Sequence, residues 1–373
     1  MHTMHFSTAA SRGGRPRPRG RRWATRLLST VAATALLVSG CGSSADRTSD
    51  DGVTTLRYQG WGNQVTLPEL AEHLGFFDQG KIKLEWVGNT ISGPQDVQSA
   101  ATGQTDFGGA FGGAVAKLVS SGAQIKAVIN YYGGDDIDYG AYYVPENSPI
   151  RTARDLIGKK IAVNTLGGQN EADIFNYLRQ QGLSIEETKQ VELVTLPPVN
   201  QEDALRRGQV DVAGLSGQFK QRADAAGGLR ILWDQHSQYG PFNGGPYVFR
   251  TDFIKNNPEA VRAFVDGVGK AIQWERLTPR DEVVRVQTEI IDARHRPNET
   301  SETLKYWLSP GVPSYYGYIV DEDFERWSDW LVSTGAVQEL PPPSELYTNE
   351  FNDNATTAVQ PAGATAPTPR TDP

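Results

Sequence analysis

The side chains that most often carry covalent or metal chemistry are scarce in this sequence. Its 373 residues include one cysteine, Cys41, and five histidines, of which only His73, His236 and His295 lie beyond the first forty residues. The sequence contains no H-E-x-x-H pair, no G-x-S-x-G turn and no Walker lysine behind a glycine-rich loop. We therefore expect a protein that is not an enzyme and has no metal site, no intrachain disulfide and no cofactor.

The segment before Cys41 is basic, whereas the rest of the chain is acidic. Residues 1–40 contain seven arginines and no lysine, aspartate or glutamate, so removing them changes the net charge from −8 to −15. The apolar stretch at 27–38 would form a helix of only about 18 Å, against roughly 30 Å of membrane hydrocarbon. Such a leader is typical of a secretion signal, and so acidic a body is unsuited to nucleic acid.

The cysteine itself ends the apolar stretch. Val38-Ser39-Gly40-Cys41 resembles the lipobox of bacterial lipoproteins, in which the signal is cleaved before the cysteine and the thiol receives a diacylglycerol. We predict a lipoprotein signal peptide over 1–40, lipidation at Cys41 and a polar tether over 41–52. The alternatives are an ordinary signal peptide with an incidental cysteine and, for the export route, a twin-arginine signal at Arg21-Arg22.

An internal repeat indicates that the chain, which is long enough for two domains, contains two copies of one design. Gly103-Gln104-Thr105-Asp106 recurs 105 residues later as Gly208-Gln209-Val210-Asp211, and Gly122 and Gly227 keep the same offset. Strand-like and helix-like patterns alternate around these anchors, which predicts an α/β fold with two lobes. We expect each G-Q-x-D glycine to end a helix and each aspartate to be a local structural device, not a catalytic acid.

The repeat also predicts how the chain is divided. We expect the first lobe to be discontinuous, formed by 53–141 and 245–351, and the second lobe to span 142–244. The Ala/Thr/Pro-rich end, 352–373, is expected to be a disordered tail. Two chain crossings then connect the lobes, and ligand sites of α/β proteins occur at such interfaces and at strand ends.

After the repeat, the sequence is rich in helical patterns. Asn257-Pro258-Glu259 is a start signal for a long amphipathic helix, with Val261, Phe264, Val265, Val268 and Ile272 on one face. Two further helical segments are expected at 281–291 and 321–335. Because these segments have no repeat partner, we expect them to pack on the first lobe.

Three segments, 92–134, 151–168 and 249–274, resemble the nitrate/sulfonate/taurine-type substrate-binding proteins of ABC importers. The resemblance covers Leu56 to about Leu331. It implies a two-lobed fold of the periplasmic-binding-protein type II kind, whose cleft closes on a small-molecule solute and presents it to an ABC permease. The solute would be of the sulfonate, nitrate, taurine or thiamine-pyrimidine class. We expect a monomer, anchored by its lipid to the extracytoplasmic face of the cell membrane, with no nucleic-acid partner.

Two alternatives remain open. One is a membrane-tethered sensor that uses the same fold without transport. The other is an enzyme like the thiamine-pyrimidine synthases, which share the architecture but use a cysteine-rich iron motif that this chain lacks.

By the same resemblance, the solute meets strand-end loops and helix N-termini of both lobes. Glycine in such loops exposes backbone N–H groups at the positive end of a helix dipole and lets a ligand come close. The predicted ligand-binding residues are Trp61, Asn63, Asn89, Ser92, Gly93, Ala110, Phe111 and Tyr131 in the first lobe, and Gly167, Gly168, Gln169, Ser216 and Gln218 in the second. The structural alternative is an ordinary glycine-rich turn or, for the aromatic residues, core packing.

No arginine stands in any of these loops, which weighs against a sulfonate or nitrate. Asp135, Asp136 and Asp138 crowd the loop before the first crossing. They would either meet an amine or nitrogen heterocycle of the solute or form a solvated acidic face.

Overall fold

The computed structural model describes Ser49 and residues 52–77 and 81–369. The leader, Cys41, most of the tether and the last four residues of the tail lie outside this description. Helices and strands alternate along the described chain, as in an α/β fold. Within these ranges, no helix combines the length and the apolar character that a membrane crossing needs.

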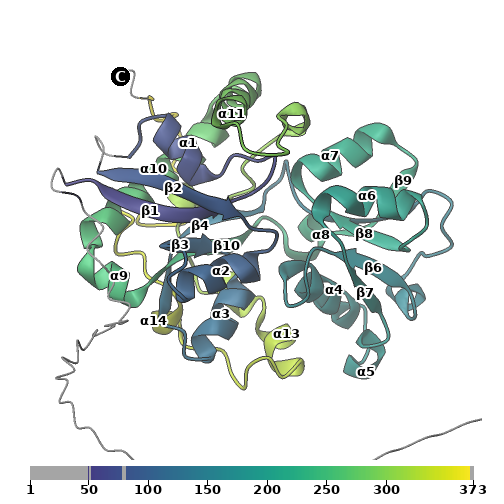
Figure 1. Cartoon of the computed structure of the whole chain (residues 1–373). Coiled ribbons are helices and arrows are strands. Elements are labelled where there is room, and N and C mark those ends of the chain that lie inside the picture. The colour runs from purple at the N-terminus through teal and green to yellow at the C-terminus, as the bar shows by residue number, and fades with distance from the viewer. Residues whose placement is uncertain (1–48, 50–51, 78–80, 370–373) are drawn as a thin grey trace, which may run out of the picture. The chain divides into compact units, whose positions relative to one another are not determined.

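The middle of the chain forms a five-stranded sheet, drawn in teal in Figure 1, and we call this part the second lobe. The strand order is β7-β6-β8-β5-β9; β6 runs parallel to β7 and β8, whereas β5 is antiparallel to β8 and β9. The apolar strands β6 and β8 are central and largely buried, as expected for parallel strands covered on both faces. Its elements are β5 (Ala141–Pro145), the 3-10 helix η2 (Ala153–Leu156), β6 (Lys160–Val163), α4 (Gln169–Gln180), α5 (Ile185–Thr188), β7 (Glu192–Thr195), α6 (Pro198–Arg206), β8 (Val212–Leu215), α7 (Gly217–Ala226), β9 (Leu229–Asp234) and α8 (Gln235–Tyr239).

The flanking segments together form what we call the first lobe. In one sheet, β1 pairs in parallel with β2; in the other, β10 lies between β3 and β4 and is antiparallel to both. The N-terminal elements are β1 (Thr54–Gly60), α1 (Leu67–His73), β2 (Ile82–Asn89), α2 (Gly93–Ala101), β3 (Phe107–Gly109), α3 (Gly112–Ser120) and β4 (Ile125–Gly134). The later elements are β10 (Phe242–Arg250), α9 (Thr251–Asn256), α10 (Pro258–Leu277), α11 (Arg280–Arg294), the 3-10 helices η3 (Glu302–Tyr306) and η4 (Tyr315–Gly317), α12 (Glu322–Glu325), α13 (Ser328–Ser333) and α14 (Pro343–Leu346).

Helix α10 completes the core that the N-terminal segment begins. The helix starts at Pro258, as its sequence predicts, and all five residues of the predicted apolar face are buried. Phe264 packs against Phe77 of the N-terminal segment and against Phe107 of β3. In Figure 1, α10 and α11 lie close to α1, although about two hundred residues separate them along the chain. This packing supports the N-terminal loops of the first lobe.

The prediction of one helical segment over 321–335 needs correction, because the structure has two short helices there, α12 and α13. Trp327 stands between them and is fully buried, and its Nε1 donates to the carbonyl oxygen of Asp323 at 3.0 Å. Arg326 and Trp327 keep right-handed helical backbone angles, so the buried tryptophan marks a short interruption between two helices.

The first part of the predicted disordered tail is packed. The Asn352 side chain is buried and donates to the carbonyl oxygen of Tyr316 at 2.9 Å, while Asp353 pairs with Arg262 at 2.6 Å. The composition of this segment, which is dominated by Ala, Thr and Pro, does not predict these polar contacts.

Candidate functional site

A cavity of about 390 Å³ is lined by residues of both lobes. This volume lies within the range of about 300–1,000 Å³ that is typical of small-molecule pockets. The first-lobe and crossing residues that line it are Trp61, residues 64–67, Gly93, Pro94, Phe111, residues 131–133, Asp138, Tyr247, Glu275, Gln287, Leu304, Trp307 and residues 309–311. The second lobe contributes Ala141, Tyr142, Asn164, residues 168–170, Pro198, Gln201, residues 214–219 and Gln235.

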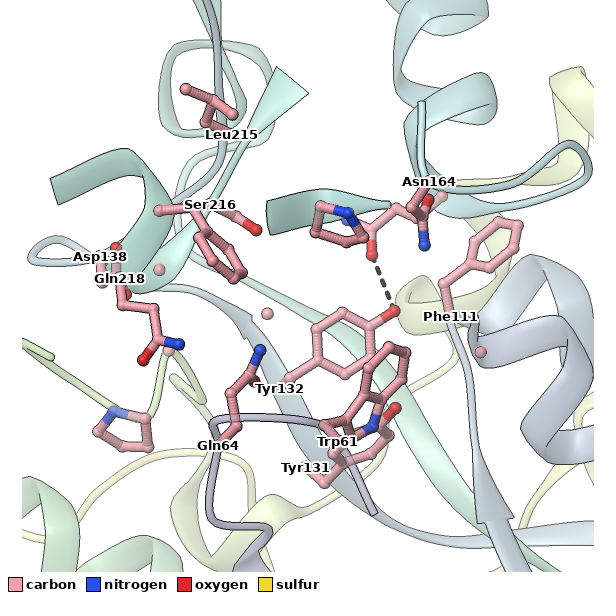
Figure 2. Close-up of a pocket in the computed structure, with 18 of the residues that line it drawn as sticks. Trp61, Gln64, Phe111, Tyr131, Tyr132, Asp138, Asn164, Leu215, Ser216 and Gln218 are labelled. Atoms are coloured by element: carbon pink, nitrogen blue, oxygen red, sulfur yellow. Dashed lines mark hydrogen bonds between the residues drawn. The ribbon is translucent and has the colours of Figure 1, made fainter. Parts of the chain in front are cut away.

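Aromatic rings form the wall of the cavity on the first-lobe side. Trp61 directly follows β1, and Tyr131 and Tyr132 lie on β4. Tyr131 stacks on Tyr247 of β10, with 4.0 Å between the ring centroids. Figure 2 shows Trp61, Tyr131 and Tyr132 close together, with Ser216 of the second lobe on the other side of the view. Such a wall suits a solute with a flat or apolar portion.

Two hydrogen bonds cross the cavity from lobe to lobe. The Tyr132 hydroxyl on β4 donates to Oε1 of Gln169, the first residue of α4, at 2.8 Å. The Gln218 amide on α7 donates to the carbonyl oxygen of Asn63 in the first lobe at 3.3 Å. The lobes therefore contact each other through residues at the cavity wall.

Helices of both lobes begin at the cavity wall, and some have a side-chain cap whereas others have none. In the first lobe, the Thr66 and Ser92 hydroxyls cap α1 and α2, each accepting from the backbone N–H three residues further on. In the second lobe, α4, α6 and α7 begin after Gly168, Pro197 and Ser216 without a side-chain cap bond. The first N–H groups of α4 and α7 are thus available to hydrogen-bond acceptors in the cavity.

Two carboxyl groups line the cavity, and burial raises the pKa of both. The pKa of Asp138 rises to about 6, although Gln221 and Lys220 act in the opposite direction. The pKa of Glu275 rises to about 8 by burial, which the hydrogen bond from Gln287 Nε2 to Oε1 at 2.6 Å offsets only in part. At pH 7, Asp138 is therefore mainly ionised and Glu275 mainly protonated.

Eight of the predicted ligand-binding residues line the cavity: Trp61, Gly93, Phe111, Tyr131, Gly168, Gln169, Ser216 and Gln218. Phe111 differs from the others because it belongs mainly to the core. Its ring is 1% exposed and packs edge-on against Trp327, with 5.2 Å between ring centroids. The structural alternative of core packing therefore describes Phe111 better than it describes Trp61.

Five predicted residues do not line the cavity in the described structure: Asn63, Asn89, Ser92, Ala110 and Gly167. The two asparagines instead make structural hydrogen bonds, Asn63 between two loops and Asn89 within β2. Asn63 has a left-handed backbone, with φ of 61°, and its Oδ1 accepts from Thr300 N at 2.8 Å. Asn89 Oδ1 accepts from Trp86 Nε1 at 3.0 Å.

The other three residues also have structural roles. Ser92 caps α2, and Ala110 is fully buried in the core. Gly167 has a φ of 70°, and its N–H donates to the Glu171 carboxylate at 2.8 Å. The turn at 167–168 was predicted as a unit, but only its second glycine lines the cavity.

The three aspartates before the first crossing have different positions. Asp138 lines the cavity. Asp135 closes its own turn, since its Oδ1 accepts from Ile137 N and Asp138 N, each at 2.8 Å. Asp136 is 81% exposed and lies 3.0 Å from His236 Nε2. Only one of the three therefore stands where a solute would meet it.

Sequence reasoning missed several polar lining residues, among them Gln64, Asn164, Glu275 and Gln287. Glu275 and Gln287 lie on the long helices α10 and α11, far along the chain from the glycine-rich loops. A signal was nevertheless present: Glu275 follows Ile272 by three residues and so continues the apolar face of α10. A glutamate on a core-facing stripe is a candidate for a polar cavity.

The chemical groups of the cavity wall can be compared with those that a metal site or a basic site would need. Among them, no three His, Cys, Asp or Glu side chains are grouped as metal ligands. No histidine, cysteine, lysine or arginine lines the cavity within the described part of the chain. What remains is a set of amides, hydroxyls, carboxyls and rings suited to holding a polar solute.

Comparisons with known proteins show which proteins this chain resembles. A candidate aliphatic sulfonates-binding protein of Escherichia coli (strain K12) is 28% identical over 198 residues, which are 50% of this chain and 54% of that protein. The match thus spans about half the length of that relative. The crystal structure of the periplasmic aliphatic sulphonate binding protein SsuA from Escherichia coli superposes with a TM-score of 0.59 at 19% identity, covering 78% of this chain and 91% of that one.

A second solved structure has the same fold. The periplasmic nitrate-binding protein NrtA from Synechocystis PCC 6803 gives a TM-score of 0.59 at 14% identity, covering 81% of this chain and 88% of that one. These similarities confirm the predicted fold of the periplasmic binding proteins. The family model described as NMT1/THI5 like matches residues 64–282, which is more than half of the sequence. This chain is therefore a member of the NMT1/THI5-like family.

Proposed function

We propose that this protein is an extracytoplasmic solute-binding lipoprotein that captures a small molecule between its lobes and delivers it to an ABC importer. The observation that carries the proposal is the cavity lined by both lobes, with the Tyr132–Gln169 and Gln218–Asn63 hydrogen bonds across it. Because each lobe provides part of one binding surface, closure of the lobes would complete the site and opening would release the solute. The family and the relatives named above support the same function.

The two crossing segments form a hinge in this proposal. Gly140 lies before β5, and its N–H donates to Gln235 Oε1 at 2.8 Å, while Gln235 N donates to the Gly140 carbonyl at 2.9 Å. Gly240 lies before β10 and has a φ of 69°, a conformation that glycine adopts without strain. Paired crossings that each contain a glycine permit rotation with few changes in backbone angle.

The solute classes to test first come from the resemblance and the relatives: sulfonates, nitrate, taurine and thiamine-pyrimidine precursors, with aromatic acids added. A screen by thermal shift on the full chain should reveal a ligand, since a hundredfold excess over the dissociation constant stabilises by about 2.7 kcal/mol. Small-angle scattering at saturation should then show compaction. A ligand that stabilises the protein without compacting it would contradict delivery by lobe closure.

We also propose that the protein binds its solute without transforming it. The cavity lacks histidine and cysteine within the described residues, and the fold by itself does not decide between binding and catalysis. After prolonged incubation with an equimolar amount of protein, mass spectrometry should recover the solute unchanged. A modified product would instead support the enzyme alternative.

The membrane anchor is proposed at Cys41, which lies outside the described residues. The position of this cysteine directly after the apolar stretch supports lipidation. In the producing cell, the full-length protein should fractionate with membranes and carry a lipid-sized mass increase, whereas C41S should lose both. If C41S remained on membranes with the same mass as the wild type, apart from the substituted atom, lipidation at this residue would be wrong.

A further inference from the structure

We infer that the solute is a ring-containing molecule without net negative charge, which presents a cationic or hydrogen-bond-donating group to Asp138. This inference rests on the proposed function and narrows it, because it selects among the solute classes that the relatives suggest. It is carried by the charge, the size and the polarity pattern of the cavity.

The ionisable groups of the cavity wall are unfavourable for an anion. Apart from tyrosines, the lining residues with ionisable side chains are Asp138 and Glu275, and none is basic in the described structure. Lys220 on α7, whose charge acts on Asp138, does not line the cavity; its ammonium lies 2.9 Å from Asp224 and 5.1 Å from the Tyr139 ring centroid. A sulfonate or nitrate would thus meet a negative charge with no basic side chain to balance it.

The arginines nearest to the Trp61 loop are already paired. Arg294 contacts Glu69 at 3.1 Å and Glu299 at 2.6 Å, and Arg296 contacts Glu69 at 2.6 Å. These side chains are largely buried, so moving a guanidinium into the cavity would leave Glu69 or Glu299 buried without its partner. The ion-pair network supports the loop and does not supply a cation to the cavity.

Asp138 is placed to meet a group of the solute. It lies at the cavity wall in the crossing segment, between the two lobes. Its Oδ1 has one long contact with Gln221 Nε2 at 3.5 Å, and the Tyr139 backbone N–H also donates to the carboxyl group. A carboxylate at a cavity wall keeps further lone pairs for a donor or a positive charge from the solute.

The N-terminus of α4 can bind another part of the solute, because it has no side-chain cap and offers backbone N–H groups from the second lobe. The N-terminus of α7 is also without a side-chain cap, but it lies beside Asp138, as Figure 2 shows. The N–H groups of α4 carry partial charges, which a neutral acceptor such as a ring nitrogen or a carbonyl satisfies. The cavity therefore fits a solute with acceptors toward the second lobe and a donor toward Asp138.

The volume and the wall favour a ring. A cavity of about 390 Å³ is much larger than nitrate or taurine requires. Trp61, Tyr131 and Tyr132 provide flat apolar surface, and the Gln64 and Asn164 amides provide donors and acceptors around it, as Figure 2 shows. Aromatic rings next to amides are a suitable surface for a nitrogen-containing ring.

Calorimetry on the full chain at pH 7.5 tests the inference with two sets of probes. One set contains 2-naphthylmethylamine, benzamidine and the aminopyrimidine precursor of thiamine; the other contains 2-naphthalenesulfonate, nitrate and taurine. We expect the tightest ligand in the first set, bound at least tenfold more tightly than any member of the second. Tighter binding of 2-naphthalenesulfonate or nitrate would overturn the inference and leave the proposed function intact. If neither set bound or compacted the protein, the proposed function itself would fail.

A pair of variants then assigns the effect to Asp138. D138N should weaken the best first-set ligand at least tenfold, whereas D136N, an exposed neighbour in the same loop, should leave its affinity unchanged. The wild-type affinity should fall as the pH drops below about 6, where Asp138 becomes protonated beside Lys220 and Asp135, and D138N should lack this fall. Equal affinities of D138N and the wild type at pH 7.5 would overturn the assignment.

Discussion

The strands of the two lobes have the same order, but they form one sheet in the second lobe and two sheets in the first. The second lobe has one continuous sheet, β7-β6-β8-β5-β9, whereas the first has β2-β1 and β3-β10-β4 in the corresponding order as two sheets. In both lobes, the strand that enters from a crossing segment, β5 or β10, is antiparallel to its two neighbours. Each crossing strand is thus built into the lobe that it enters, which leaves the segments just before these strands as the parts that can bend.

The two repeated aspartates, Asp106 and Asp211, also combine a shared feature with a difference between the lobes. Asp106 Oδ2 accepts from Arg57 N, and Asp211 Oδ2 accepts from Lys160 N, both at 2.8 Å. The glycines before them, Gly103 and Gly208, are both left-handed. This confirms that the G-Q-x-D unit is a structural device in both lobes. The difference is burial: Asp106 is fully buried and also binds the Arg57 guanidinium at 3.1 Å.

The largest effect should separate these two aspartates. D106A should lower the free energy of unfolding by about 3–5 kcal/mol, because it removes one partner of a buried ion pair. D211A should cost only about 1 kcal/mol, the usual contribution of a hydrogen bond. Denaturant unfolding of both variants measures the difference. Equal losses of unfolding free energy would show that the two G-Q-x-D units contribute equally to stability.

A second comparison concerns one buried carboxyl in each lobe. Glu275 has one hydrogen-bond donor, Gln287, and a pKa of about 8; Asp173 has donors in Gln235 and Tyr239 and a pKa raised by burial only to about 6. Since the pKa of Glu275 rises on folding, the unfolded chain loses this proton first. The free energy of unfolding therefore falls as the pH increases from about 4.5 to about 8.

We expect E275Q to abolish that part of the pH dependence and to have a free energy of unfolding about 4–5 kcal/mol higher than the wild type above pH 8. D173N should instead lower the free energy of unfolding by about 1 kcal/mol at pH 7, because it weakens the acceptor of the hydrogen bonds from Gln235 and Tyr239. Denaturant unfolding from pH 5 to 9 checks both. If the unfolding free energies of the wild type and E275Q changed in parallel with pH, the assignment of this pH dependence to Glu275 would be wrong.

The smallest effect should concern the contact between the lobes. Y132F removes the hydrogen bond to Gln169 and should weaken solute binding about fivefold, equivalent to about 1 kcal/mol. The control is Y143F, since the Tyr143 hydroxyl bonds Asp224 at 2.6 Å within the second lobe. Calorimetry should find unchanged solute affinity for Y143F, and a similar loss in both variants would mean that the Tyr132 bond has no special role in closure.

Much of the fold was predictable because its signals are local. Caps such as Asn257-Pro258 and the alternation from β1 to β4 lie in short windows of sequence. The insertion of β10 between β3 and β4 was not predictable in this way, since more than a hundred residues separate the paired strands. The break at Trp327 was not predictable either, because the buried residues Phe324, Trp327 and Leu331 follow helical spacing and favour one continuous helix.

For the candidate site, sequence reasoning found the loops but not which atoms face the cavity. Trp61 and Gln169 line it as predicted, whereas Asn89 is bound to Trp86. A glycine-rich turn fixes the backbone, but the direction of each side chain depends on packing with distant elements. Glu275 was missed for that reason, because only the tertiary structure brings α10 to the cavity.

The central claim is that both lobes hold one solute, and calorimetry on the full chain tests it most directly. With the tightest ligand from the two probe sets, the wild type should bind one molecule per chain. Both W61A in the first lobe and Q169A in the second should weaken that same event at least fivefold. Undiminished affinity in either variant, or two independent binding events, would contradict a single site shared between the lobes.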